Sequence, residues 1–163
     1  MAKYTSDSAN KIIKNLQAEV DRILDIEKRY RTYSHGPDET PIVPTEYDFG
    51  ETRNEVAKLR AEIGKLRHAV NVFNATAILP DDTITIDEAL FRMHHLNEDK
   101  KRLQEMLAIP EVERERLYGR EADIVHRNFD PRKAKAAYTD VCSELMGIQQ
   151  KINMANMTME FEA

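Results

Sequence analysis

The sequence predicts a mainly α fold: an antiparallel helical bundle of long, coiled-coil-like helices with a small two-stranded β element. Apolar residues recur at steps of three and four through four long segments, which is the spacing of helices that pack along a seam. Helix-start signals precede two of these segments, and prolines bound or separate them. A chain of 163 residues fits one domain, so we expect residues 1–163 to form a single helical domain.

The first predicted helix covers residues 8–33, and its apolar side chains form one stripe. That stripe comprises Ile12, Ile13, Leu16, Val20, Ile23 and Leu24. Residues 34–49 contain three of the six prolines of the chain, so we predict an exposed and mobile loop there.

The second predicted helix covers residues 50–74 and has heptad-like apolar spacing. Its apolar positions are Val56, Leu59, Ile63, Leu66, Val70 and Phe73. Because a loop joins two helices that each have an apolar stripe, we expect the first two helices to form a long antiparallel hairpin.

The third helix is predicted to begin at a capping box, with Thr85 as the N-cap and Glu88 three residues later. Pro80 and the two aspartates after it predict a turn, and residues 83–85 predict a short strand. Pro110 cannot continue a helix and closes this one. The apolar stripe comprises Ile86, Leu90, Met93, Leu96, Leu103 and Leu107.

A fourth helix is predicted to open at Asp130 and Pro131, an N-cap residue followed by a residue that suits the first helical turn. The less regular residues 119–129 predict an extended strand beside residues 83–85. The apolar residues of the fourth helix again stand at heptad steps, at Ala134, Tyr138, Val141, Leu145, Ile148, Ile152 and Ala155.

One phrase occurs twice, at residues 59–76 and 141–158, 82 positions apart. Both copies place a glutamate early, continue with apolar steps and end in Asn-x-x-Asn-x-Thr. Duplication accounts for this, and so does a packing problem that two helices solve in the same way. The end motif comprises Asn71, Asn74 and Thr76 in the first copy and Asn153, Asn156 and Thr158 in the second.

The asparagines of each motif lie three residues apart, beside the apolar seam of their helix. An asparagine costs a helix about half a kcal/mol relative to alanine, so two such pairs require a compensating interaction. Amides both donate and accept hydrogen bonds, and four of them could line a polar pocket for a small ligand. The alternative is structural: the asparagines end their helices in the left-handed cap conformation, or they satisfy one another between subunits.

Composition excludes several classes of function. The net charge of −5 argues against DNA, RNA and anionic membranes as partners. No run approaches the roughly 20 apolar residues of a membrane span, and the first residues lack the apolar core of a signal peptide. Cys142 is the single cysteine, so there is no disulfide framework. We therefore expect a cytoplasmic protein.

Positive charge is concentrated at residues 114–135, which contain seven lysines or arginines against four acids. Arg127, Arg132 and Lys133 surround the start of the fourth helix, where free amides and arginines could hold a phosphate. The aromatic residues that could stack on a base are Tyr118, Phe129 and Tyr138. Asp130 counts against this site because it would occupy the amides as an N-cap, and a solvated basic face is the alternative.

Other candidate chemistry is sparse. His94 and Glu98 share a helical face and could hold a metal, but no second cluster has matching spacing. Cys142 lies beside an apolar seam and is interpreted as a small core residue. A group of methionines near the C-terminus offers soft apolar surface, which suits either core packing or contact with another copy of the chain. The sequence has no Gly-rich phosphate loop and no nucleophile motif, so we expect neither an enzyme nor a cofactor.

Taken in order, the two Asn motifs, the segment TITIDEAL and the segment ADIVHRNFD resemble the septicolysin-like family of small helical bacterial proteins. The similarity covers nearly the whole chain, from the first hairpin to the terminal INMANMTMEFE. Met157 is a departure, because members of the family often have tryptophan directly after the last asparagine. The resemblance implies a mostly helical, oligomeric protein, and no catalytic residue is carried over from it.

These observations lead to three hypotheses of function. The first is a non-enzymatic homo-oligomer that binds a small anionic metabolite or a signalling nucleotide at the Asn motifs, in a pocket shared between subunits. Arg67, or the basic group near Arg132, would supply the positive charge. The second is a structural coiled-coil protein without a ligand, and the third is a hydrolase with a metal at His94 and Glu98.

Overall fold

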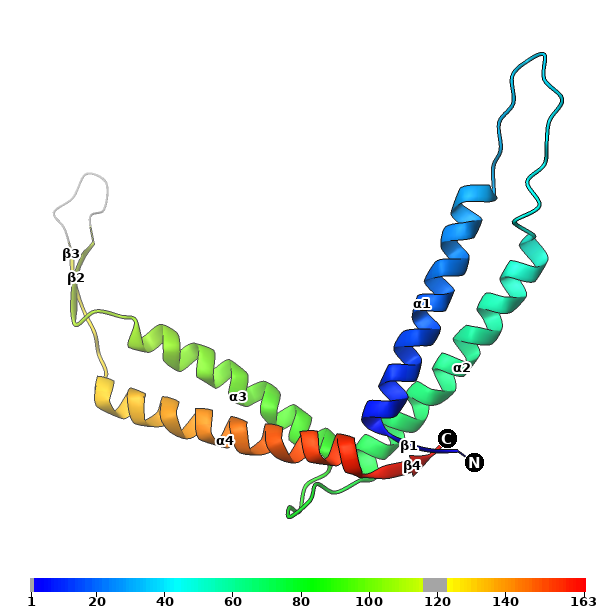
Figure 1. The fold of residues 1–163 in the computed structure, drawn as a ribbon. Coiled ribbons are helices and arrows are strands. Elements are labelled where there is room, and N and C mark those ends of the chain that lie inside the picture. Colours follow the sequence, from blue (N-terminus) through cyan, green and yellow to red (C-terminus); the bar gives the residue numbers. More distant parts are fainter. Residues whose placement is uncertain (1, 116–122) are drawn as a thin grey trace. The chain divides into compact units, whose positions relative to one another are not determined.

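The computed structural model describes residues 2–115 and 123–163 and divides the chain into two compact units (Figure 1). The first unit comprises Met1–Thr76 and Asn156–Ala163, and the second comprises Ala77–Ala155. Each unit contains a pair of helices and a two-stranded antiparallel sheet. The chain is therefore mainly helical with a small β component, as predicted, whereas the single domain stays a prediction.

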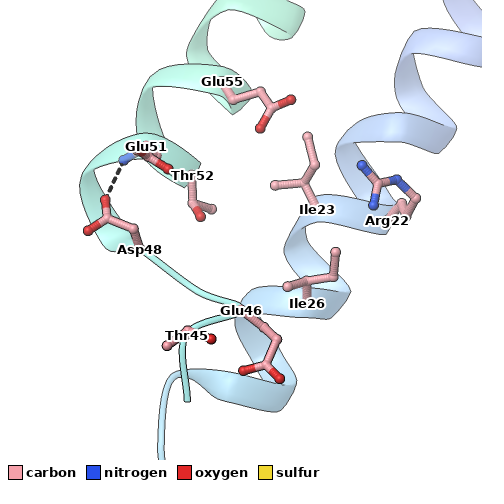
Figure 2. A pocket seen from close by; sticks show the side chains of 9 residues that line it. All are labelled: Arg22, Ile23, Ile26, Thr45, Glu46, Asp48, Glu51, Thr52 and Glu55. Atoms are coloured by element: carbon pink, nitrogen blue, oxygen red, sulfur yellow. Dashed lines mark hydrogen bonds between the residues drawn. The ribbon is translucent and has the colours of Figure 1, made fainter. Parts of the chain in front are cut away.

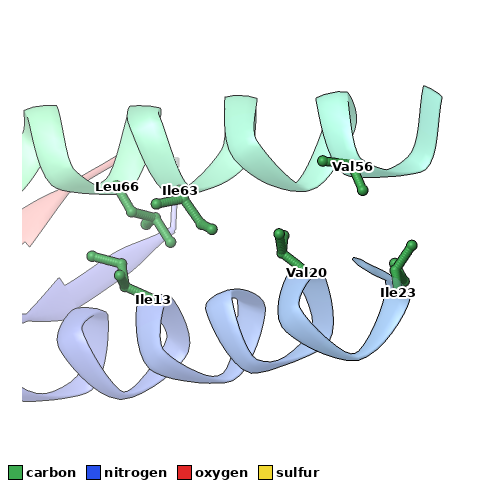
Figure 3. Close-up of a cluster of buried hydrophobic side chains, with 6 residues drawn as sticks. All are labelled: Ile13, Val20, Ile23, Val56, Ile63 and Leu66. Carbon is green, nitrogen blue, oxygen red and sulfur yellow. The ribbon is translucent and has the colours of Figure 1, made fainter. Parts of the chain in front are cut away.

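The first unit is built on helices α1 (Ser6–Tyr30) and α2 (Phe49–Thr76). Their apolar stripes face each other along the pair, with the start of α1 beside the end of α2 (Figure 3). This confirms the predicted antiparallel hairpin, whose closure removes these side chains from water. The buried cluster comprises Ile13, Val20, Ile23, Val56, Ile63 and Leu66.

A short sheet that the sequence did not predict joins the two ends of the chain. Strand β1 (Lys3–Thr5) pairs antiparallel with strand β4 (Glu160–Glu162), and Tyr4 faces Phe161 in the register. Thr5 then serves as the N-cap of α1, because its hydroxyl accepts a hydrogen bond from the Ser8 amide at 3.2 Å. This cap places the first helix two residues earlier than predicted.

Residues 31–48 connect α1 to α2 without helix or strand, as expected for the proline-rich segment. The mobility of this segment stays a prediction. The loop returns to α1 at Tyr47, whose hydroxyl donates a hydrogen bond to Glu27 at 3.4 Å. Asp48 then accepts a hydrogen bond from the Glu51 amide at 2.7 Å and so satisfies a free donor in the first turn of α2.

The second unit is built on helices α3 (Ile86–Leu107) and α4 (Pro131–Thr158), and the last three residues of α4 belong to the first unit. Two ion pairs cross it: Arg92 with Glu144, and Asp82, just before α3, with Lys151. Their order along the chain shows that the helices are antiparallel. In the described part of this unit the buried residues are Leu79 before α3, Ile86, Ala89, Leu96 and Leu103 on α3, and Ala134, Ile148, Ile152 and Ala155 on α4.

Both predicted helix starts in this unit are confirmed. Thr85 accepts a hydrogen bond from the Glu88 amide at 3.2 Å, and the Glu88 carboxylate accepts one from the Thr85 amide at 2.7 Å. Asp130 accepts a hydrogen bond from the Arg132 amide at 2.9 Å and opens α4. Of the helices in the described part of the chain, none is long and apolar enough to cross a membrane.

The predicted strand near Ile124 exists, but its predicted partner was wrong. Strand β3 (Asp123–His126) pairs antiparallel with strand β2 (Val112–Glu115), and Ile124 faces Arg114. Residues 83–85 form no strand, and Thr85 makes only an isolated bridge with Ile78. Pairing two strands that are seven residues apart in sequence costs less chain entropy than pairing with residues about forty positions earlier.

Candidate functional site

The two Asn motifs occupy the same place in two helices of equal length. α2 and α4 each have 28 residues, and a shift of 82 positions maps Phe49 onto Pro131 and Thr76 onto Thr158. The repeat therefore extends to whole helices, and each helix ends at the threonine of its motif. Asp81 is the only non-glycine residue in the described ranges with a positive φ, so the left-handed cap conformation suggested for the asparagines is wrong.

The four asparagines fall into two classes of exposure. Asn71 and Asn153, the first of each motif, are exposed, whereas Asn74 and Asn156 are partly buried. The amide oxygen of Asn153 accepts a hydrogen bond from Gln149 at 2.9 Å, one turn earlier on α4. Each motif therefore presents its first amide to solvent and covers its second in part.

Of the four motif asparagines, Asn74 has a buried side-chain oxygen, Oδ1, that lacks a hydrogen-bond donor among the described residues. A buried acceptor without a donor costs about 1–3 kcal/mol, so such atoms are rare in folded proteins and call for an explanation. The residue before it, Phe73, is buried and stacks on Phe161 of β4, with ring centroids 5.0 Å apart.

The threonines lead each helix into a strand contact. The Thr76 hydroxyl donates a hydrogen bond to the Val72 carbonyl at 2.8 Å, which fixes its rotamer against its own helix. Two residues after Thr76, Ile78 pairs with Thr85, the N-cap of α3. Two residues after Thr158, Glu160 pairs with Thr5, the N-cap of α1. Each motif is thus followed, two residues later, by a backbone pairing with the N-cap threonine of another helix.

The predicted basic group at the start of α4 is tied into local structure. Arg132 pairs with Asp130 at 3.3 Å, and Arg127 donates to the Ile109 carbonyl and lies 5.6 Å from the Phe129 ring centre. Asp130 already occupies the Arg132 amide, and this hydrogen bond lowers the pKa of its carboxyl. The suggested phosphate site therefore has an internal anion in place.

Position separates this basic group from the Asn motif of the same helix. Arg132 and Asn153 are 21 residues apart on α4, which corresponds to about 30 Å along the axis. The exposed Lys133 lies at the same end as Arg132. Within one chain these cations cannot share a pocket with Asn153. Tyr118, proposed to stack on a base, lies outside the described residues.

Arg67 is placed differently from the other predicted cations. It stands four residues before Asn71 on α2, so the two share a face one turn apart. It is exposed and has no hydrogen bond or ion pair with any residue in the described ranges. Arg67 can therefore reach a ligand that contacts Asn71.

The first unit also contains two hollows that the sequence did not predict. One, of about 190 Å³, lies where the loop enters α2 and carries four carboxylates, from Glu46, Asp48, Glu51 and Glu55 (Figure 2). Its one arginine, Arg22, is bound to Glu19 through two hydrogen bonds. The second, of about 320 Å³, has a largely apolar lining on α1 and α2 that includes Arg53 and Arg60. With Arg67, these two arginines form a seven-residue repeat that could have been found in the sequence.

A third hollow, of about 270 Å³, lies between α3 and α4. Its charged residues are the two ion pairs that cross the second unit. The hydrogen bond from Lys151 to Asp82, at 2.6 Å, lowers the pKa of that carboxyl. Because each cation already has its anion, this hollow has no free charge to offer a ligand.

The remaining candidates are local contacts. The two side chains of the proposed metal pair, His94 and Glu98, are 3.6 Å apart at their nearest nitrogen and oxygen. In residues 2–115 and 123–163, no three His, Cys, Asp or Glu side chains could hold a metal together. Cys142 is partly buried and hydrogen-bonds with Tyr138, which raises the pKa of the Tyr138 hydroxyl. No nucleophile–base pair emerges from these contacts.

Comparison with known proteins gives no further guide to the site. No protein-family model, no curated protein and no solved structure matches the chain.

Proposed function

We propose that the protein is a non-enzymatic homo-oligomer that binds a small anionic metabolite or a signalling nucleotide at its Asn motifs. The resemblance to the septicolysin-like family favours an oligomer, and we place the protein in the cytoplasm. The predicted long coiled-coil bundle belongs to this proposal, with seams completed between copies. Ligand chemistry rests on Asn71, Asn74, Asn153 and Asn156, with Arg67 as the cation one turn from Asn71.

The buried oxygen of Asn74 carries the proposal. A carboxamide oxygen without a donor is a feature that a bound N–H or O–H group would satisfy, and nucleobases and sugars provide such groups. The exposed amides of Asn71 and Asn153 can both donate and accept at the surface. Arg67, one turn from Asn71, adds the charge-assisted hydrogen bonds that phosphate and carboxylate prefer.

The basic residues at the start of α4 could contact a ligand at the Asn motif only if a second copy of the chain supplied them. Because Arg132 and Lys133 lie about 30 Å from Asn153 along the same helix, a neighbouring subunit would have to present them to the motif. A pocket that requires two copies explains why a ligand site is incomplete in one chain. It also predicts that dissociation of the oligomer abolishes binding.

Isothermal titration against a nucleotide panel, with the full chain, tests the proposal. Asn74→Ala should weaken binding by about two- to tenfold, since one net hydrogen bond contributes roughly 0.5–1.5 kcal/mol. The same change should leave the free energy of unfolding equal or higher, because it removes an unpaired acceptor. Asn54→Ala, an exposed position on the same helix, is the matched control and should bind as the native protein does.

Two outcomes contradict the proposal. No heat with any member of the panel, while native mass spectrometry shows no retained small molecule, would leave it without a ligand. A stability loss in Asn74→Ala with unchanged affinity would assign the asparagine to folding alone. The double variant Asn71→Ala, Asn153→Ala adds a check on the exposed amides and should also weaken binding.

The alternative is an assembly protein with no small-molecule ligand. One observation favours it: Met146 and Met157 on α4 are 64% and 70% exposed. Large exposed apolar side chains on one helix often mark a contact with another chain. Light scattering distinguishes the two, since a stable oligomer that binds no member of the panel supports assembly alone.

A further inference from the structure

The apolar hollow of the first unit has the size and lining of a small-molecule site. Its volume of about 320 Å³ falls within the range of roughly 300–1,000 Å³ that is usual for such sites. Leu24 of α1 and Val56 and Ala57 of α2 contribute apolar lining, and Val56 is buried. Phe49, at the start of α2, also lines it and is 64% exposed. A ligand here would cover aromatic surface that water now contacts.

Two arginines make this hollow selective for charge. Arg53 and Arg60 both line it, and neither has a hydrogen bond or ion pair with any described residue. They stand seven residues apart, which puts them on one face of α2 about 10 Å from each other along the axis. Their guanidinium groups, each with five donors, are unpaired in a chain whose net charge is −5.

Among the described residues that line the hollow, Glu27 supplies the one carboxylate, and it already has a partner. It accepts the hydrogen bond from the Tyr47 hydroxyl at 3.4 Å. The lining therefore carries two cations against one anion. Arg67 continues the row of arginines by a further seven residues, and the small Ala57 and Gly64 stand between them. An extended anion could follow this face of α2 without meeting a bulky side chain.

We propose that this hollow binds a small amphipathic anion. The aromatic or aliphatic body of the ligand lies against Phe49, Val56 and Leu24, and its carboxylate, sulfonate or phosphate head contacts Arg53 and Arg60. Apolar contact supplies most of the affinity, and the arginines select an anion over a neutral molecule of the same shape. The site uses none of the asparagines, so it does not depend on the function proposed above.

Two fluorescent probes of similar shape test this with the full chain. The aromatic sulfonate 8-anilino-1-naphthalenesulfonate carries the required charge, and N-phenyl-1-naphthylamine is its neutral counterpart. We expect saturable binding of the sulfonate and weaker binding of the amine. Arg53→Gln with Arg60→Gln should weaken the sulfonate by at least about tenfold and leave the amine unchanged.

Matched variants separate this site from other apolar surface. Ala57→Leu fills the hollow with a good helix former and should weaken both probes while the circular dichroism spectrum stays native. Lys58→Gln removes a cation from another face of the same helix and should change neither probe. Decanoate should displace the sulfonate, and decyltrimethylammonium should not.

Any of three results overturns the inference. The arginine double variant could bind the sulfonate as the native protein does. The amine could bind as tightly as the sulfonate, which would make the hollow an apolar contact surface without charge selection. Alternatively, Ala57→Leu could leave both affinities unchanged, which would place the bound probes elsewhere.

Discussion

The two helical hairpins share a plan and differ in what holds them closed. In the first, α1 and α2 bury a row of large aliphatic side chains, including Ile13, Val20 and Ile63. In the second, three alanines are among the buried residues, one ion pair joins α3 to α4, and a second joins α4 to Asp82 just before α3. The repeated phrase therefore marks the same end of α2 and α4 but does not determine how each helix packs.

The shared plan extends to the end of each hairpin where its first helix begins and its second helix ends. A threonine caps the first helix, a threonine ends the second, and the residue two positions later pairs with a capping threonine. The contact that follows α2 is made with the start of α3, and the contact that follows α4 is made with the start of α1. Duplication and a shared packing solution both account for the equal helix lengths and similar caps, while the pairing differs: three residue pairs join β1 to β4, and an isolated bridge joins Ile78 to Thr85.

The largest expected effect tests the difference in packing. Ile63 and Leu145 stand at matching positions of the repeat, but Ile63 is 5% exposed whereas Leu145 is only partly buried. Ile63→Ala should lower the free energy of unfolding by about 2–5 kcal/mol, and Leu145→Ala should lower it by less. Urea denaturation measures both. Equal losses at the two positions would show that the hairpins depend on burial to the same degree.

A smaller effect is expected at the two capping boxes. Thr85→Ala and Thr5→Ala should each cost about 1 kcal/mol, because each removes the acceptor for a first-turn amide. The hydrogen bond from the Thr85 amide lowers the pKa of Glu88, so this box stabilises the fold above the unfolded pKa of glutamate. Its contribution is lost as pH falls through the lower folded pKa. The box of Thr5 and Ser8 has no carboxylate and should show no such dependence.

Measurement of melting temperature at pH 7 and pH 3 separates the two boxes. Thr85→Ala keeps the amide but removes the hydrogen bond that the Thr85 hydroxyl donates to the Glu88 carboxylate at 3.0 Å. Its cost should therefore shrink at the lower pH, while the cost of Thr5→Ala should stay constant relative to the native protein. If both costs change with pH in the same way, the Glu88 carboxylate is not the group responsible.

Features that depend on residues close together in the sequence were predicted correctly, whereas strand pairs between residues far apart in the sequence were not. The starts of α3 and α4 were predicted because their caps are local: Thr85 with Glu88, and Asp130 with Pro131. The sheet of β1 and β4 was missed because strands of three residues at opposite ends of the chain carry no local signal. The partner of β3 was wrong for a related reason, since the charged residues of β2 read as irregular sequence.

For the site, the sequence located the Asn motifs but not their individual roles. It could not distinguish Asn74, whose oxygen is buried, from Asn71, which is exposed, because that difference depends on how the end of α2 is covered. The sequence predicted that Asp130 would occupy the amides at the start of α4, but not that the Arg132 side chain would pair with it. The hollow between Arg53 and Arg60 was not, because it forms only when α1 packs on α2.

Two mid-helix glycines test whether another copy of the chain packs against either hairpin. Gly64 on α2 and Gly147 on α4 have open space where a Cβ would lie. Alanine should therefore raise the free energy of unfolding by about 0.5–1 kcal/mol at both positions, because glycine is a poor helix former. Urea denaturation again measures the change. A loss of stability at one glycine would show that another copy of the chain approaches the backbone of that helix.

The smallest expected effect concerns the ion pair that closes the second hairpin, Lys151 with Asp82. Both side chains are partly exposed, so solvent screens the pair, and its contribution should fall at high salt. The hydrogen bond from Lys151 lowers the pKa of Asp82, which makes the stabilisation present above the unfolded aspartate pKa, near pH 4. It is lost as pH falls through the folded value.

Asp82→Asn should thus lower the melting temperature slightly at pH 7 and less at pH 3. Lys11→Gln, which removes an exposed pair within α1, is the control and should leave the second hairpin unchanged in hydrogen exchange. A full-sized effect of Asp82→Asn at pH 3 would mean that the side chain acts through the turn before α3 rather than through Lys151.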